Sequence, residues 1–168
     1  MKPIQLVTAA LITAAMCVIA PVTVPMGVIP LSAATVCVYL AAALLGSWNG
    51  ALCTIVYILI GTLGVPVFAG YSAGAAQVMG ITGGFILGYI PCVIIAGAIL
   101  SRRSKGWRVP LAFAVGTLAL YAVGTVWYMW QTGSSLVTAL SLCVLPFLLG
   151  DAVKIAAATG LVGLLRRS

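Results

Sequence analysis

The chain has 168 residues, of which 64% are hydrophobic and 5% are charged, and its formal net charge is +7. So few charged side chains cannot cover the surface of a soluble protein, and the composition therefore predicts a membrane protein. The chain has no histidine, one acidic residue and five cysteines without paired spacing, so we expect neither a metal nor another cofactor.

The basic residues gather at three places outside the apolar segments: Lys2; Arg102, Arg103, Lys105 and Arg108; Arg166 and Arg167. By the positive-inside rule, all three groups lie in the cytoplasm and near anionic lipid, and we expect no nucleic-acid partner. The uncharged stretches 3–101 and 109–150 then hold even numbers of spans of about 20 residues each. We predict a single all-α membrane-embedded domain over residues 1–168, with six transmembrane helices and both termini cytoplasmic, in the cell membrane.

In chain order, the first span lies near residues 4–20. It is followed by an outer loop with three prolines, PVTVPMGVIP. The second span covers about residues 31–45, the stretch GSWNG forms a short inner turn, and the third span lies near 51–63. This order places the next connection on the outer side.

That connection is glycine-rich: GTLGVPVFAGYSAGAAQVMGITGG, residues 61–84. Irregular backbone at membrane depth must be shielded by protein or must line a cavity, so the segment predicts either the wall of a substrate pocket or a glycine-rich helix interface. The fourth span follows near 85–100 and the fifth near 109–130. QTGSS is the next outer turn, and the sixth span ends at Leu165.

Asp151 is the only acidic residue, and Lys154 follows it by three positions within the last apolar segment. This spacing puts both side chains on one helical face. Counting back from Arg166 places Asp151 roughly 22 Å above the inner interface, where a charge costs about 2.5–3.5 kcal/mol to insert. The pair therefore indicates either a private ion pair between helices or, as we favour, a ligand with both N–H and C=O groups.

Several stretches resemble one family along nearly the whole chain: IPLSAATVCVYLAAALLG, GTLGVPVFAG, GITGGFILGY, GTVWYMWQTGSSLVTAL and VLPFLLGDAVK. They are similar to the BioY family, the biotin-binding S component of energy-coupling factor (ECF) transporters. The chain departs from the family pattern at Ala34, where a glutamine is expected, at Tyr71, where a glycine is expected, and at Ile81, where a proline is expected.

The resemblance implies a six-helix vitamin binder with an outward pocket, biotin as substrate, and a coupling transmembrane subunit and two ATPase subunits as partners. The acidic and lysine pair of the family falls on Asp151 and Lys154. Asp151 would accept a hydrogen bond from an N–H of the ureido ring. Lys154 would bind either the ureido carbonyl or the valerate carboxylate.

Further residues are candidates for the ligand. If Lys154 binds the ureido ring, neutral donors must bind the valerate carboxylate. The candidates are Tyr71, Ser72, Gln77 and backbone N–H groups around Gly83 and Gly84. Trp127 and Trp130 could pack on the apolar bicycle, or belong to an interfacial aromatic belt. Phe68 could have either of these roles, and its loop position favours a lid.

Ala10 and Ala14 form a small-xxx-small pair in the first span, which permits close approach of another helix. On sequence alone this indicates internal packing as readily as docking. The resemblance favours docking of the coupling subunit.

The chain has no phosphate-binding loop, so any ATP-driven transport needs separate ATPase subunits. An intramembrane enzyme using Lys154 and Ser141 is disfavoured, because Asp151 one turn away favours a charged lysine, and we expect no enzymatic activity. Two further functions stay open, that of a structural assembly subunit and that of an S component for a different vitamin.

Overall fold

The structure is a computed structural model that describes residues 3–24, 30–100 and 106–165. The basic residues that predict orientation mostly lie outside the described residues: Lys2, Arg102, Arg103, Lys105, Arg166 and Arg167. The orientation of the chain across the membrane therefore stays a prediction.

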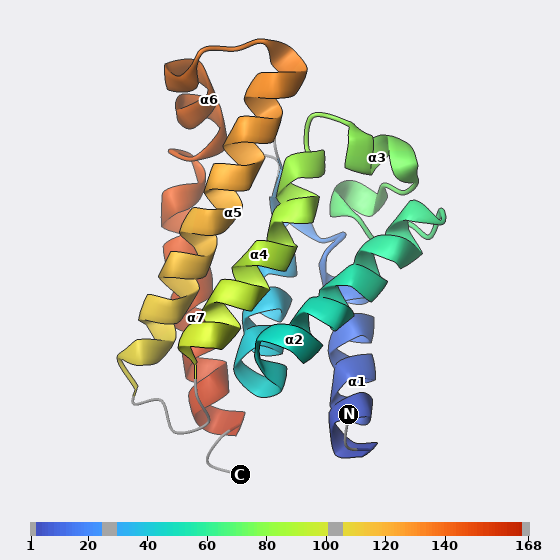
Figure 1. Cartoon of the computed structure of the whole chain (residues 1–168), viewed down its shortest axis with the longest axis vertical. Coiled ribbons are helices and arrows are strands. Elements are labelled where there is room, and N and C mark those ends of the chain that lie inside the picture. The colour runs from blue at the N-terminus through green and yellow to red at the C-terminus, as the bar shows by residue number, and fades with distance from the viewer. Residues whose placement is uncertain (1–2, 25–29, 101–105, 166–168) are drawn as a thin grey trace.

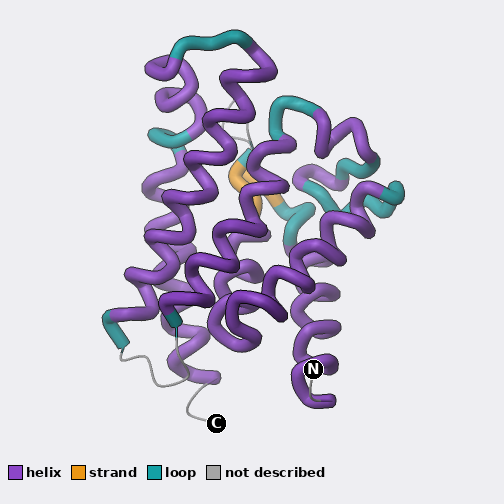
Figure 2. The backbone as a smooth tube through the Cα atoms, viewed as in Figure 1, coloured by secondary structure: helices purple, strands orange, loops and turns teal. Residues whose placement is uncertain are grey.

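The fold is all-α, as predicted. In the described part of the chain it has seven α-helices, with these bounds: α1 (Pro3–Ile19), α2 (Ala34–Thr62), α3 (Ala75–Met79), α4 (Gly83–Ile99), α5 (Arg108–Thr132), α6 (Leu136–Cys143) and α7 (Phe147–Leu165). By length and composition, α2, α5 and α7 can cross a membrane, and α1 and α4 are shorter apolar helices. The remaining elements are a 3-10 turn, Ala69–Tyr71, and two antiparallel strands, β1 (Thr23–Val24) and β2 (Leu31–Ser32). Figure 2 shows these strands as one short stretch among the helices.

The chain reverses direction inside α2. Gly46 has φ 78° and ψ −172°, a left-handed conformation that glycine adopts without a steric penalty. A Cβ on Gly50 would lie 3.1 Å from the carbonyl oxygen of Ala41, although a straight helix would separate these residues by about 13 Å. The two limbs, visible in Figure 1, correspond to the predicted second and third spans, and the break falls in the predicted turn GSWNG.

The core forms where α4 packs against α2 and α5 (Figure 1). Small residues permit this approach. A Cβ on Gly88 would lie 2.7 Å from Leu120 of α5, and one on Gly97 would lie 2.5 Å from the backbone nitrogen of Ser47 in the α2 reversal. The three elements therefore form one closely packed block.

The ends of the helices separate into two groups in Figure 1. The start of α1, the α2 reversal, the end of α4, the start of α5 and the end of α7 lie at the lower end of the bundle. The glycine-rich segment, with α3, and the connection from α5 to α6 lie at the upper end. The described helix ends that adjoin the three basic groups in the sequence thus lie at the same end of the bundle.

Two segments differ from the sequence expectation. The stretch after QTGSS contains two helices, α6 and α7, separated by a turn that ends at Pro146. Proline lacks the N–H that would continue α6, and it is tolerated just before a new helix. The glycine-rich segment is also less irregular than expected, because it contains the 3-10 turn and α3.

Candidate functional site

A polar cluster surrounds the only carboxylate of the chain. Asp151 on α7 is 5% exposed. The Tyr121 hydroxyl on α5 donates to its Oδ2 at 2.5 Å, and Lys154 Nζ donates to its Oδ1 at 3.0 Å. Lys154 Nζ also donates to the carbonyl oxygen of Ser32 in β2 at 2.6 Å. The cluster therefore joins α7 to both α5 and β2.

Because the two charged side chains are largely buried, the hydrogen bonds they make offset a cost of desolvation. The side chains of Lys154 and Asp151 are 13% and 7% exposed, and removing charges from water carries a large desolvation cost. Hydrogen bonds to ionised groups offset that cost more than neutral ones do. The ion pair considered from the sequence is thus formed, but Asp151 also faces a cavity, so its role extends beyond Lys154.

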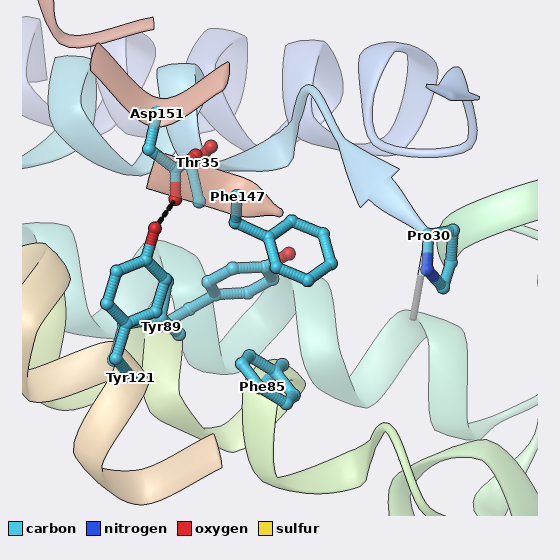
Figure 3. A pocket seen from close by; sticks show the side chains of 8 residues that line it. Pro30, Thr35, Phe85, Tyr89, Tyr121, Phe147 and Asp151 are labelled. Carbon is cyan, nitrogen blue, oxygen red and sulfur yellow. Dashed lines mark hydrogen bonds between the residues drawn. The ribbon is translucent and has the colours of Figure 1, made fainter. Parts of the chain in front are cut away.

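We call this space the Asp151 cavity (Figure 3). Its volume is about 50 Å³, and its lining residues are Pro30, Thr35, Phe85, Tyr89, Leu120, Tyr121, Phe147 and Asp151. The walls are mainly aromatic and aliphatic, with a few polar groups among them. A small apolar space with a carboxylate at its wall suits the polar head of a ligand whose remainder is apolar.

A second space, the loop cavity, lies under the glycine-rich segment. Its volume is about 190 Å³, and its lining residues are Pro30, Phe68, Ala69, Ser72, Gln77, Thr82, Phe85, Ile86 and Tyr89. Pro30, Phe85 and Tyr89 line both cavities. The two spaces are therefore neighbours, one beside the charged cluster and one beside the neutral polar side chains of the loop.

Three of the predicted ligand residues line the loop cavity. Ser72 and Gln77 are half-buried there, and the Ser72 hydroxyl donates to the carbonyl oxygen of Ala69 at 2.8 Å. Phe68 is 1% exposed and packs edge-on against Tyr57. Phe68 is thus a buried wall of the cavity in this structure, and its role as a lid stays a prediction.

Tyr71, Gly83, Gly84 and Trp127 are absent from the lining of both cavities. Tyr71 is 68% exposed. The two glycines serve close packing, since a Cβ on Gly83 would clash with the backbone of Val78 and one on Gly84 with Trp127.

Trp127 has a partner in the glycine-rich segment. Its indole nitrogen donates to the carbonyl oxygen of Gly80 at 2.9 Å, and its ring meets Trp130 edge-on. Both tryptophans line an apolar groove along α5. Trp127 therefore holds the loop against α5 in this arrangement.

Among the polar residues that line the Asp151 cavity, the sequence did not single out Thr35, Tyr89 and Tyr121. A buried tyrosine needs a partner for its hydroxyl, so a tyrosine inside an apolar span is the signal that could have identified two of them. The partner could not have been named, because Tyr121 and Asp151 are 30 residues apart and on different helices.

Ala10 and Ala14 lie elsewhere, on an open groove between α1 and the second limb of α2. Its volume is about 490 Å³, and its lining is Leu6, Ala9, Ala10, Thr13, Ala14, Cys17, Leu52, Cys53, Val56 and Ile60. Both alanines are exposed. They thus face outward and do not close an internal helix interface.

Comparisons with known proteins agree on one family. The model of the BioY family matches residues 1–168. The chain is 37% identical over 158 residues to a probable biotin transporter BioY of Pyrococcus horikoshii, covering 94% of this chain and 93% of that protein. It is 32% identical over 155 residues to the biotin transporter BioY of Thermotoga maritima, covering 92% and 90%. The crystal structure of an S-component for biotin from an ECF-type ABC transporter superposes with a TM-score of 0.92 at 23% identity, covering 99% of this chain and 93% of that one, and thus shares its fold.

Proposed function

The chain belongs to the BioY family, and we propose that it is a multi-pass membrane protein that takes up biotin as the substrate-binding S subunit of an ECF transporter. The observation that carries the proposal is the buried carboxylate of Asp151 at the wall of a cavity, in a chain with no other acidic residue. The compared relatives are named biotin transporters, which agrees with the expectation that the chain is not an enzyme.

The two neighbouring cavities suggest how biotin lies. Its ureido ring has two N–H groups and one carbonyl, which match the carboxylate of Asp151 and the ammonium of Lys154. With the ring in the Asp151 cavity, the valerate chain extends toward the loop cavity, where Ser72 and Gln77 offer neutral donors. Lys154 lines neither cavity, but its ammonium donates to Asp151, which lines the Asp151 cavity and not the loop cavity, and this supports placing the ring there. In the opposite direction, Lys154 would take the carboxylate.

The six predicted spans can be assigned to α1, the two limbs of α2, α4, α5 and α7, with both termini cytoplasmic. The charged groups of the basic clusters would then share the inner side, and the glycine-rich segment with the loop cavity would face outward. The coupling subunit and two ATPase subunits would complete the transporter.

The test is calorimetry of detergent-purified protein with a panel of vitamins. We expect tight binding of biotin alone, and Asp151→Asn should weaken it at least tenfold. The change replaces an acceptor oxygen by a donor, and a lost charge-assisted hydrogen bond is worth about 1.5–3 kcal/mol. Tight binding of another vitamin, or of none, would contradict the proposal. Native biotin affinity in the double variant Asp151→Asn with Lys154→Met would show that the pair is only an internal ion pair.

A separate affinity measurement tests which end of biotin contacts Lys154. If Lys154 binds the ureido carbonyl, Lys154→Met should weaken biotin and a biotin amide alike. If Lys154 binds the carboxylate, the variant should narrow the difference in affinity between the two ligands.

Docking of the coupling subunit is tested on α1. Ala10→Trp should abolish co-purification with that subunit while biotin binding persists, because the indole would fill the groove that a partner helix must enter. Leu11→Trp is the matched control, since Leu11 is 66% exposed on the same helix but does not line the groove. Equal assembly by both variants would place the partner elsewhere.

A further inference from the structure

Two buried threonine hydroxyls have no hydrogen-bond partner among the described residues, those of Thr35 and Thr125. A threonine inside a helix usually donates to the carbonyl four residues earlier. Threonines 8, 13, 54, 62, 117, 132 and 159 do so here. The hydroxyls of Thr35 and Thr125 therefore differ from those of these threonines in lacking this hydrogen bond.

The position of Thr35 explains why the usual bond is missing. Thr35 is the second residue of α2, so the residue four positions earlier, Leu31, belongs to β2 and not to the helix. Thr35 is 5% exposed, so its hydroxyl has little access to bulk water. An unpaired buried hydroxyl is unfavourable, and such groups in native proteins usually have a reason outside simple stability.

Only one of the two hydroxyls is at the candidate site. Thr35 lines the Asp151 cavity together with Asp151 and Tyr121, whereas Thr125 is absent from that lining. Figure 3 shows Thr35 with Asp151 at one end of the cavity. Each oxygen of the Asp151 carboxylate already accepts a protein donor. Each oxygen keeps a further acceptor site for a ligand N–H, but an ionised carboxylate cannot donate, so a hydroxyl beside it adds a contact that Asp151 cannot make.

We propose that Thr35 is a specificity-determining residue whose hydroxyl hydrogen-bonds the ureido ring of the ligand beside Asp151; this rests on the proposed function. A hydroxyl both donates and accepts, so it can serve either an N–H or the carbonyl of a cyclic urea. Asp151 is acceptor-only when ionised. Thr35 on α2 and Asp151 on α7 then form hydrogen bonds with different atoms of the same ring.

The experiment combines calorimetry with biotin and thermal unfolding without ligand, both on detergent-purified protein. Thr35→Val keeps the shape of the side chain and removes the hydroxyl. We expect affinity to fall about tenfold, because a polar atom of the ring loses its partner, while the melting temperature stays equal or rises. Thr35→Ser should keep affinity within about threefold, since it retains the hydroxyl.

Thr125→Val is the matched control, since it removes the other unpaired buried hydroxyl away from the cavity. It should leave biotin affinity unchanged. A biotin amide should lose as much affinity as biotin in Thr35→Val, whereas a loss confined to biotin would place the hydroxyl at the carboxylate and overturn the assignment to the ring.

Three other results would overturn the inference while the proposed function stands: native biotin affinity in Thr35→Val, an equal loss in Thr125→Val, or a loss in Thr35→Val that comes with a lower melting temperature and is not restored by serine. Failure of the parent protein to bind biotin would instead refute the proposed function.

Discussion

Glycines have different surroundings in α4 and α5 than in α7. A Cβ on Gly97 would lie 2.5 Å from the backbone of Ser47, and one on Gly116 would lie 2.9 Å from the carbonyl oxygen of Cys92. A Cβ on Gly160 or Gly163 of α7 would have nothing within 4 Å. The same residue type thus permits close helix packing in one region and leaves an open surface in the other.

The helices of the two regions are correspondingly held by different forces. Half of the most apolar 18-residue window of α5 is buried, against 17% for α7. The described polar contacts of α7 to other elements include those from Tyr121 to Asp151 and from Lys154 to Ser32. Dispersion between closely packed backbones is the larger contribution in the first region, whereas in the second the hydrogen bonds of Asp151 and Lys154 add to the packing of a few buried apolar side chains. Variants of each contact can test this difference.

The largest effect is expected when a polar contact of α7 is removed. Tyr121→Phe deletes the donor to Asp151 Oδ2, and a hydrogen bond to a charged group contributes about 1.5–3 kcal/mol. We expect a lower melting temperature in detergent and weaker biotin binding. Tyr128→Phe, the same change about two turns further along α5, serves as the control and should have a smaller effect. Equal effects of the two variants would contradict the role given to the polar contacts.

A slightly smaller effect is expected in the closely packed block. Gly97→Ala places a methyl group against the backbone of Gly46 and Ser47, which cannot rotate away as a side chain could. Overpacking of this kind costs about 1–3 kcal/mol. The melting temperature should fall, and an unchanged value would show that the α2 reversal can move away from α4.

The smallest effect, with the opposite sign, is expected on α7. Gly160 is exposed and has space for a methyl group, and alanine is the better helix former by roughly 0.5–1 kcal/mol. Gly160→Ala should therefore raise the melting temperature slightly without altering biotin affinity. A clear loss of stability would mean that α7 is as closely packed as α4.

Local patterns in the sequence predicted much of this fold. Runs of apolar residues located the helices, the glycine in GSWNG located the α2 reversal, and the spacing of Asp151 and Lys154 predicted their shared face. The division of the last segment into α6 and α7 was missed, although Pro146 was a signal for it.

The walls of the Asp151 cavity could not be predicted in the same way. Tyr121 and Thr35 lie beside Asp151 but belong to other helices, and Lys154 meets Ser32 across 122 positions. Such contacts depend on how helices pack, which composition and periodicity do not specify. The sequence therefore identified the charged pair and three neutral residues of the loop cavity, but not the neutral polar groups beside Asp151.

The reversal at Gly46 also determines how the protein matches the thickness of a bilayer. At 1.5 Å per residue, α5 is about 37 Å long, whereas the limbs of α2, residues 34–45 and 47–62, are only about 18 and 24 Å long. The hydrocarbon core is about 30 Å thick, and each ångström of hydrophobic mismatch costs a fraction of a kcal/mol. The first limb is largely buried, so lipid would have to thin beside α1 and the second limb of α2, the side that carries the open groove with Ala10 and Ala14. A partner covering that side would relieve the deformation, so membrane thickness itself would favour assembly there, and co-reconstitution in lipids of increasing chain length should strengthen it.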